Sequence, residues 1–275
     1  RRRGTVGPAL PGVQLRVISS GADRPLGTPM MGTTPLAAAG SGGALTEGRY
    51  QFAATFVGAD GQESGSTQPQ SLEVAADGVI TITGLPAAWP AGVTGMRLYL
   101  TTPNGATLMR AHYTDTPTTS FTFASLPLLG ARCPSVLLVP MPAGQIVRIF
   151  NGRLLVASGS MLVYSEPWAF ALRNPSRNYI PFSSQITMLE VCDDGFYVAA
   201  DNTYWIGNDI TTSDLTTVRP FGAVPRTGAT VPNSTDVWWM SERGRMLGKN
   251  GGEVASLEEE NVAVPRAQSG ASLFR

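Results

Sequence analysis

Turn dipeptides cut the chain into short apolar segments, and no segment between them has the periodicity of a helix. The clearest segment is 48–57, where Tyr50, Phe52, Ala54 and Phe56 fall on one face with a period of two. This alternation is typical of a half-buried strand. Shorter apolar segments follow at roughly ten-residue spacing: 72–74, 79–83, 96–100, 108–113 and 120–123.

The connections between these segments carry strong turn signals. Asp60-Gly61, Asp77-Gly78 and Asn104-Gly105 are dipeptides that favour tight turns between antiparallel strands. Six or seven short strands with such turns predict an immunoglobulin-like or fibronectin-III-like sandwich over 44–125. The Cys-Trp-Cys pattern of antibody domains is missing, so this prediction concerns architecture only.

Composition agrees with an all-β fold. Charged residues make up 15% of the chain, whereas globular domains average about a quarter. Long solvated helices need such residues on their wet face. The 31 glycines and 21 prolines suit many turns. The whole chain is therefore predicted to be all-β.

Two segments look irregular. Residues 1–43 hold several prolines, one alternating stretch at 13–18, and the small-residue run 37–43. We expect an extended N-terminal arm and linker there. Residues 126–142 are rich in proline and leucine, and are expected to form a linker between two domains.

Residues 143–275 contain a weak repeat. Three segments, 151–165, 194–207 and 236–248, each read as a strand, a tight turn and a second strand. Val156, Val198 and Trp239 occupy equivalent positions at spacings of about 42 and 41 residues, the period of a propeller blade. A closed propeller typically has about four to eight blades. The sequence thus predicts a partial propeller-like domain of about three hairpins, completed by the arm or by another chain.

Catalytic patterns are scarce. His112 is the only histidine, and its structural role is favoured over a catalytic one. Glu166, Asp201 and Asp236 could serve as paired carboxylates of a polysaccharide hydrolase, but nothing selects a pair. Asp193-Asp194 fits turn chemistry better than a calcium loop. We therefore expect no catalytic residue, no metal, no cofactor and no enzymatic activity.

The two cysteines lack the spacing of a metal site. We expect Cys133 and Cys192 to be free buried thiols, although a disulfide is possible. No window is long and apolar enough to cross a bilayer, so no membrane anchor is expected, and no signal peptide is recognised.

Interaction residues are easier to nominate. The net charge is zero, which argues against a broad nucleic-acid-binding face. The basic run at the start of the sequence and the tryptophans of the second half are candidate interface residues. Trp238 and Trp239 are adjacent on a strand and face opposite sides, so one is expected in the core. The candidates are Arg1, Arg2, Arg3, Trp168, Trp205, Trp238 and Trp239.

Several strings resemble virion proteins of tailed bacteriophages and prophages. Residues 151–157 (NGRLLVA) and 163–167 (VYSEP) are similar to a recurring NGRLYVA…YYSEP pattern of that family. Residues 45–50, 61–65, 82–86 and 97–101 resemble its upstream segments, and Arg1-Arg2-Arg3-Gly4 resembles the end of a further one. The resemblance covers about 45–260 and implies a tail-nozzle-like, tail-tip or head–tail junction protein with propeller blades and an Ig-like module.

The function expected from these observations is structural. The chain would be a virion component of the tail or the head–tail junction, assembled in the host cytoplasm. Its partners would be other copies in a ring, neighbouring tail or connector proteins, and phage DNA passing through the channel. The alternative is a receptor- or carbohydrate-binding tail module, with a depolymerase as a third possibility.

Overall fold

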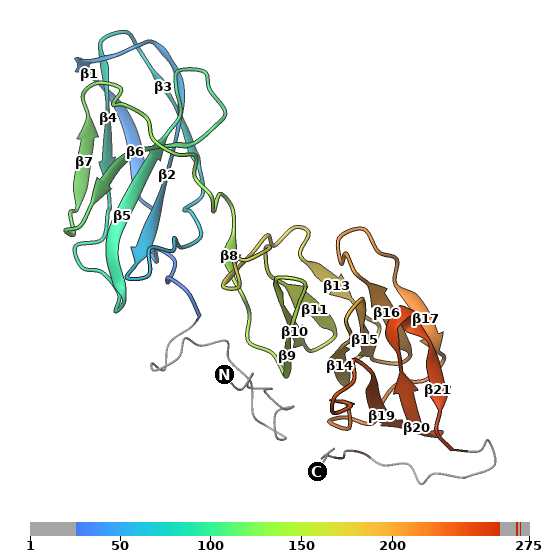
Figure 1. Ribbon diagram of the computed structural model, residues 1–275. Coiled ribbons are helices and arrows are strands. Elements are labelled where there is room, and N and C mark those ends of the chain that lie inside the picture. The colour runs from blue at the N-terminus through green and yellow to red at the C-terminus, as the bar shows by residue number, and fades with distance from the viewer. Residues whose placement is uncertain (1–25, 259–267, 269, 271–275) are drawn as a thin grey trace. The chain divides into compact units, whose positions relative to one another are not determined.

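The structure is a computed structural model that describes residues 26–258, 268 and 270 (Figure 1). Strands dominate it, and its one helical element within those residues is the short 3₁₀ turn η1 at Asn250–Gly252. The prediction of an all-β protein is confirmed. The described residues form two compact units: 26–140 with 171–175, the N-terminal unit, and 141–170 with 176–270, the C-terminal unit.

The N-terminal unit contains two antiparallel sheets. One has the strand order β1-β4-β7 and the other β3-β2-β5-β6, and a third pairing joins β8 to β12. The strands are β1 (Leu36–Leu45), β2 (Gly48–Gly58), β3 (Gln70–Val74), β4 (Gly78–Thr83), β5 (Val93–Leu100), β6 (Met109–Thr114), β7 (Ser120–Phe123), β8 (Val139–Pro140) and β12 (Leu172–Arg173).

The core of this unit lies between the two larger sheets. Tyr50, Phe52 and Phe56 of β2 pack with Ile80 and other residues of the opposite sheet, and all are buried. The face with period two in the sequence is therefore the core face of β2. Burying large aromatic side chains is the main favourable term in such a sandwich.

Residues 37–43 differ from the linker expected of them. They belong to β1, which pairs with β4 from Leu36↔Thr83 to Ser41↔Gly78 and bulges before Leu45. Most side chains of β1 are exposed, so no apolar alternation marks the strand in the sequence. Backbone pairing holds it, and its glycines and alanines permit close approach to β4.

The segment 126–142 also differs from a free linker. The N–H of Gly130 donates to the carbonyl of Arg110 at 2.8 Å, and the N–H of Cys133 donates to the carbonyl of Leu108 at 2.9 Å. The segment thus pairs with the edge of β6, and Cys133 is buried against Tyr99. Prolines in the segment do not prevent this, since neighbouring residues supply the N–H donors. Contacts divide the chain after Pro140 instead.

The C-terminal unit consists of three four-stranded antiparallel sheets (Figure 1). Consecutive strands are neighbours in each sheet, with β12 left out of the first. The first sheet contains β9 (Ile146–Phe150), β10 (Arg153–Ser158), β11 (Met161–Tyr164) and β13 (Tyr179–Pro181); the second β14 (Met188–Val191), β15 (Gly195–Ala199), β16 (Thr203–Gly207) and β17 (Thr216–Arg219); the third β18 (Ala229–Thr230), β19 (Val237–Ser241), β20 (Gly244–Gly248) and β21 (Val254–Ser256).

The three hairpins predicted from the repeat are the central strand pairs of these sheets. Val156, Val198 and Trp239 lie on the second strand of successive sheets and are all buried. Each of the three periodic hairpins therefore marks a whole sheet, and the two outer strands of each sheet carry a weaker sequence pattern.

Neighbouring sheets share a core. Leu155 of the first sheet packs with Phe196 and Val198 of the second, and Tyr197 on the other face of the second packs with Trp239 of the third. Alternating residues of β15 thus contribute to two different cores. The middle sheet is buried on both faces, which explains its continuous apolar sequence.

One ion pair joins the first strands of two sheets. Arg148 of β9 donates from Nε to Oε2 of Glu190 on β14 at 3.1 Å, and from a terminal nitrogen to Oε1 at 2.5 Å. The side chains of Arg148 and Glu190 are 18% and 5% exposed. This two-pronged contact fixes the separation and register of β9 and β14.

No helix in the described part of the chain has the length and hydrophobicity that a bilayer crossing requires.

Candidate functional site

The predicted interface residues have separate environments in the structure. Arg1, Arg2 and Arg3 lie outside the described residues. Trp168, Trp205, Trp238 and Trp239 all belong to the C-terminal unit, but they do not form one surface.

Trp205 and Trp239 are core residues and not interface residues. Trp239 is 0% exposed and Trp205 is 8% exposed. Their ring centroids lie 5.4 and 4.7 Å from that of Tyr197. Their predicted role at an interface is corrected here: each side chain points into the core between the second and third sheets, where a partner cannot reach it.

Trp238 lies on the opposite face of β19, as alternation requires. It pairs in register with Leu247 of β20 and Ala229 of β18, and it is half-buried. The expectation that one of the two adjacent tryptophans is in the core is confirmed by Trp239. No core cluster of the described residues joins this outer face of the third sheet to a further sheet.

Trp168 is the exposed tryptophan. It is 80% exposed, in the connection between β11 and β12. The N–H of Ala169 donates to the carbonyl of Glu166 at 3.2 Å, and Trp168 has φ +59°. With Pro167 before it, Trp168 occupies the turn position that normally favours glycine. A bulky residue in this conformation is strained, and strain of this kind concentrates at functional sites.

Three sets of contacts hold the strained turn. The N–H of Trp168 donates to the carbonyl of Gly152 at 2.7 Å. A Cβ on Gly152 would lie 2.9 Å from Cε2 of the indole, so the ring rests against this glycine. The carboxylate of Glu166 accepts hydrogen bonds from Arg177 and Asn178 at 2.9 and 3.0 Å. The indole is thus presented to solvent from a fixed position.

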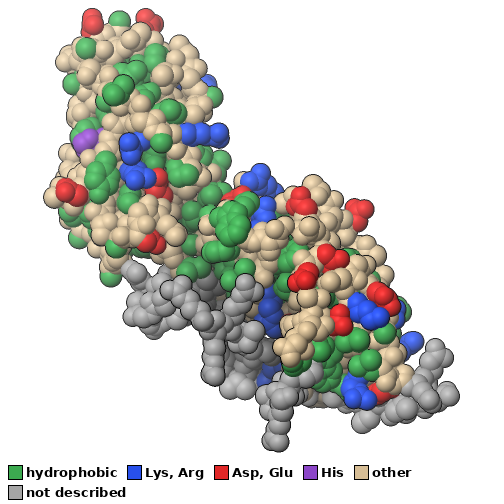
Figure 2. Space-filling model, viewed as in Figure 1, with side chains coloured by type: hydrophobic (Ala, Val, Ile, Leu, Met, Phe, Trp, Pro, Cys, Tyr) green, Lys and Arg blue, Asp and Glu red, His purple; other side chains and the backbone are tan. Residues whose placement is uncertain are grey.

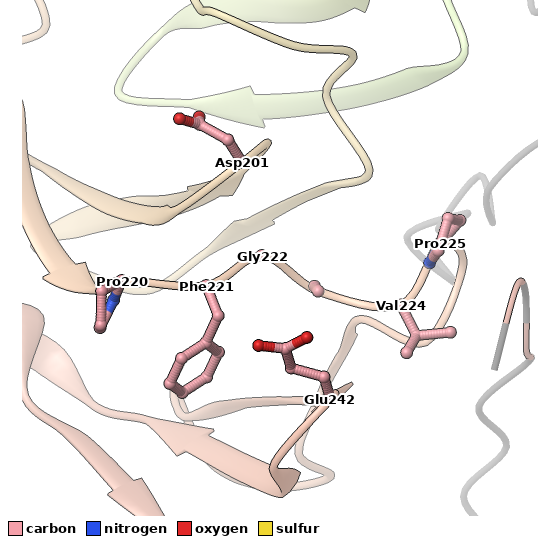
Figure 3. Close-up of a pocket in the computed structure, with 8 residues that line it drawn as sticks. Asp201, Pro220, Phe221, Gly222, Val224, Pro225 and Glu242 are labelled. Carbon is pink, nitrogen blue, oxygen red and sulfur yellow. The ribbon is translucent and has the colours of Figure 1, made fainter. Parts of the chain in front are cut away.

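A cavity of about 340 Å³ lies at the β17–β18 connection (Figure 3). Pro220, Phe221, Val224 and Pro225 line it, and two carboxylates, those of Asp201 and Glu242, stand at it. Arg243 covers the Phe221 ring at 5.0 Å. Hydrogen bonds, first from Ser183 and then from Tyr204, hold the pKa of Asp201 below its usual value. The lining includes no histidine, cysteine or lysine, so it supplies no neutral base or amine nucleophile.

The three carboxylates considered for polysaccharide hydrolysis come from different connections. Glu166 is held by Arg177, and Asp201 accepts a hydrogen bond from the Tyr204 hydroxyl at 3.1 Å. Asp236 precedes β19. Within the described ranges, no hydrogen bond joins any two of these carboxylates. The described part of the chain contains no cluster of three or more histidine, cysteine, aspartate or glutamate side chains that could hold a metal ion.

The histidine and the cysteines have structural environments. His112 stacks on Phe121 with ring centroids 4.0 Å apart, and burial lowers its pKa. Cys133 and Cys192 are free and buried, as predicted. Burial, followed by the charge of Asp194, raises the pKa of Cys192 to about 12. Such a thiol is unreactive at neutral pH.

Sequence reasoning missed a second cavity, of about 630 Å³, in the N-terminal unit. Arg97 of β5 and Arg110 of β6 line it together with residues of the 126–142 segment. Asn104-Gly105 predicted the hairpin between these strands, and from its register the two arginines could have been assigned to one face. The sequence could not predict that residues 128–130 form a wall of this cavity, because the segment 126–142 was expected to be a linker.

No protein-family model matches the chain, and no curated protein is significantly similar to it.

Proposed function

We propose that the protein is a non-enzymatic structural component of a tailed-phage virion, in the tail or at the head–tail junction. The observation that carries the proposal is the succession of three stacked four-stranded sheets, which ends in an apolar face. On the third sheet that face includes Met240 and Leu247, both half-buried. Stacked sheets bury their faces pairwise, so a terminal face favours further association.

A propeller-like arrangement of the C-terminal unit accounts for its sheets. Each sheet is a meander of consecutive strands, and β9 lies beside β14, as the first strands of adjacent blades do. Three blades are fewer than the smallest usual ring, so the proposal includes completion by another chain or by a segment outside the described residues.

An Ig-like interpretation suits the N-terminal unit. Its two sheets, of three and four strands, enclose one core and together contain seven strands. That is the strand number of the simplest immunoglobulin-type sandwich. In a virion, such a module would project from the ring or contact a neighbouring subunit.

The proposed partners are further copies in a ring and other tail or connector proteins, with phage DNA transiently inside the channel. Large interfaces between many copies suit a protein with few charges. A lumen in contact with DNA would present neutral or acidic side chains, because arginine clusters would hold the phosphates.

Mass measurement of the purified chain tests this proposal. Sedimentation velocity over a range of concentrations should reveal a closed oligomer, and Leu247→Asp should shift it towards monomer. The control Arg49→Gln changes an exposed residue of the other unit. A wild-type chain that stays monomeric at high concentration, and that is missing from purified particles carrying its gene, would rule the proposal out.

A receptor- or carbohydrate-binding tail module is the second candidate, and Trp168 favours it. A rigid, solvent-exposed indole can stack on the apolar face of a sugar ring or anchor a protein partner. A glycan array with wild-type protein and Trp168→Ala tests it. Binding that disappears in the variant supports this function, and an array without signal for the wild type speaks against it.

A further inference from the structure

The 630 Å³ cavity of the N-terminal unit has the chemistry of an anion site. It lies at the outer face of β5 and β6, and its lining contains two arginines, a histidine and a tyrosine but no carboxylate. Figure 2 shows basic side chains beside hydrophobic ones close to the single histidine. Its volume falls in the range of small-ligand and side-chain pockets, about 300–1,000 Å³.

Arg97 is one of the two cations. It forms an ion pair with Glu63, whose side chain is 6% exposed. Glu63 also accepts hydrogen bonds from the hydroxyls of Tyr99 at 2.5 Å and Thr55 at 2.7 Å, so its oxygens are fully engaged. The Nε of Arg97 is buried and has no acceptor among the described residues. This N–H donor is therefore unsatisfied and enclosed by the protein, and Arg97 lines the cavity with a guanidinium whose charge is paired with Glu63.

Arg110 is the second cation, and its charge is uncompensated. Its side chain makes no ion pair or hydrogen bond with another described residue. The guanidinium lies against Gly130, where a Cβ would sit 2.9 Å from Nε and 3.0 Å from a terminal nitrogen. Backbone hydrogen bonds between Arg110 and the 130–131 segment fix this approach. The glycine allows the arginine to lie along the cavity wall.

Apolar surface adjoins the two arginines. Leu128 is 98% exposed, and Tyr113 is 47% exposed with its ring lying over Gly95. Both residues line the cavity together with Leu129. Exposed apolar side chains beside the Arg110 guanidinium suit a ligand that is both acidic and apolar.

We propose that this cavity binds a carboxylate side chain, with an adjacent apolar residue, from an acidic peptide segment of a partner protein. The free charge decides between anions: Glu63 neutralises Arg97, which leaves about one positive charge, on Arg110. One carboxylate matches it, whereas a phosphate group carries up to about two charges. A planar guanidinium also binds a carboxylate through two parallel hydrogen bonds.

The chain itself supplies a suitable probe peptide. Its one run of three acidic residues, 258–260, follows Leu257. A capped peptide with the sequence of 256–262 (SLEEENV) is titrated into the full-length protein by calorimetry, beside a peptide with the three glutamates replaced by glutamine. We expect the acidic peptide to bind and the glutamine peptide to bind at least about tenfold more weakly. Added salt should lower the affinity of the protein for the acidic peptide, because it screens the attraction between the charges.

Two variants of the cavity and one control make the test specific. Arg110→Gln removes the unpaired charge, and Gly130→Ala displaces the guanidinium while keeping its charge. Each variant should lower the affinity for the acidic peptide by about tenfold. Arg49→Gln removes one charge from an exposed site outside the cavity and should change nothing. Circular dichroism verifies the fold of each variant.

Three results would overturn the proposal. They are equal affinity for the glutamine peptide, undiminished affinity in Arg110→Gln, and tighter binding of inorganic phosphate or a short DNA duplex than of the acidic peptide. The proposal is independent of ring assembly, since the cavity lies wholly within the N-terminal unit.

Discussion

The ion pair between the first two sheets of the C-terminal unit allows a quantitative test of how these sheets are held together. In Glu190→Gln the side chain keeps its shape, but it loses its charge and one acceptor oxygen. Arg148 then stays 18% exposed beside a neutral amide. Its guanidinium has lost the carboxylate that compensated for its transfer from water.

The expected cost follows from that geometry. Removing one partner of a buried ion pair costs about 3–5 kcal/mol. Arg148 retains some contact with water, and glutamine still accepts one hydrogen bond, so we expect about 2–3 kcal/mol of unfolding free energy to be lost. For a unit of this size the melting temperature should fall by about 10 °C. Arg148→Met should cost more, about 4 kcal/mol, because Glu190 is the more buried partner.

The double variant Arg148→Met/Glu190→Met supplies the control. It removes both charges and fills the space with apolar atoms, so its stability should lie within about 1 kcal/mol of the wild type. Urea unfolding followed by tryptophan fluorescence suits this unit, which holds four of the five tryptophans. The reasoning is refuted if each single variant costs less than about 1 kcal/mol, or if the double variant equals the sum of the single ones.

Four further predictions concern individual residues. Burial lowers the pKa of His112 below 6.5, so the unfolded chain binds this proton more readily; stability of the N-terminal unit should decline as the pH falls below 6.5, seen as faster amide exchange in β6, and His112→Phe should remove this dependence. Cys192, with a pKa raised to about 12, should react with iodoacetamide far more slowly in native than in urea-unfolded protein, and rapid native labelling detected by mass spectrometry would contradict its burial. Gly152→Ala should lose about 1–2 kcal/mol in urea unfolding, because φ is +70° and the new Cβ meets the indole. Trp168→Gly should lose nothing and gain up to about 1 kcal/mol from relief of its left-handed conformation; a clear loss would mean that the indole stabilises the fold.

Strands with two-residue alternation were predictable because local sequence carries their whole signal. β2, β4, β5 and β7 match the expected segments within a few residues, since apolar side chains on one face define each of them. β1 was missed for the opposite reason. Its alanines and glycines show no alternation, and only pairing with β4 makes the segment a strand.

The candidate sites were less predictable than the strands. The sequence does not show that Trp168 is exposed and Trp205 is buried, because both tryptophans have aromatic neighbours in the sequence and lie near turns. The prolines at 127 and 134 suggested a break in structure, yet residues between them pair with β6. A sequence shows where proline removes a donor, but not which edge accepts the donors that remain.

Local sequence patterns were enough to predict the all-β class, most of the strands and the three hairpins of the C-terminal unit. These depend on side-chain period and turn chemistry within about ten residues, which any reader of the chain can see. Only the tertiary contacts show which faces meet, that Glu190 binds Arg148, and that the Arg110 side chain forms no ion pair with another described residue. Those outcomes depend on contacts between residues distant in the chain, because charge and burial are properties of the assembled neighbourhood and not of the residue.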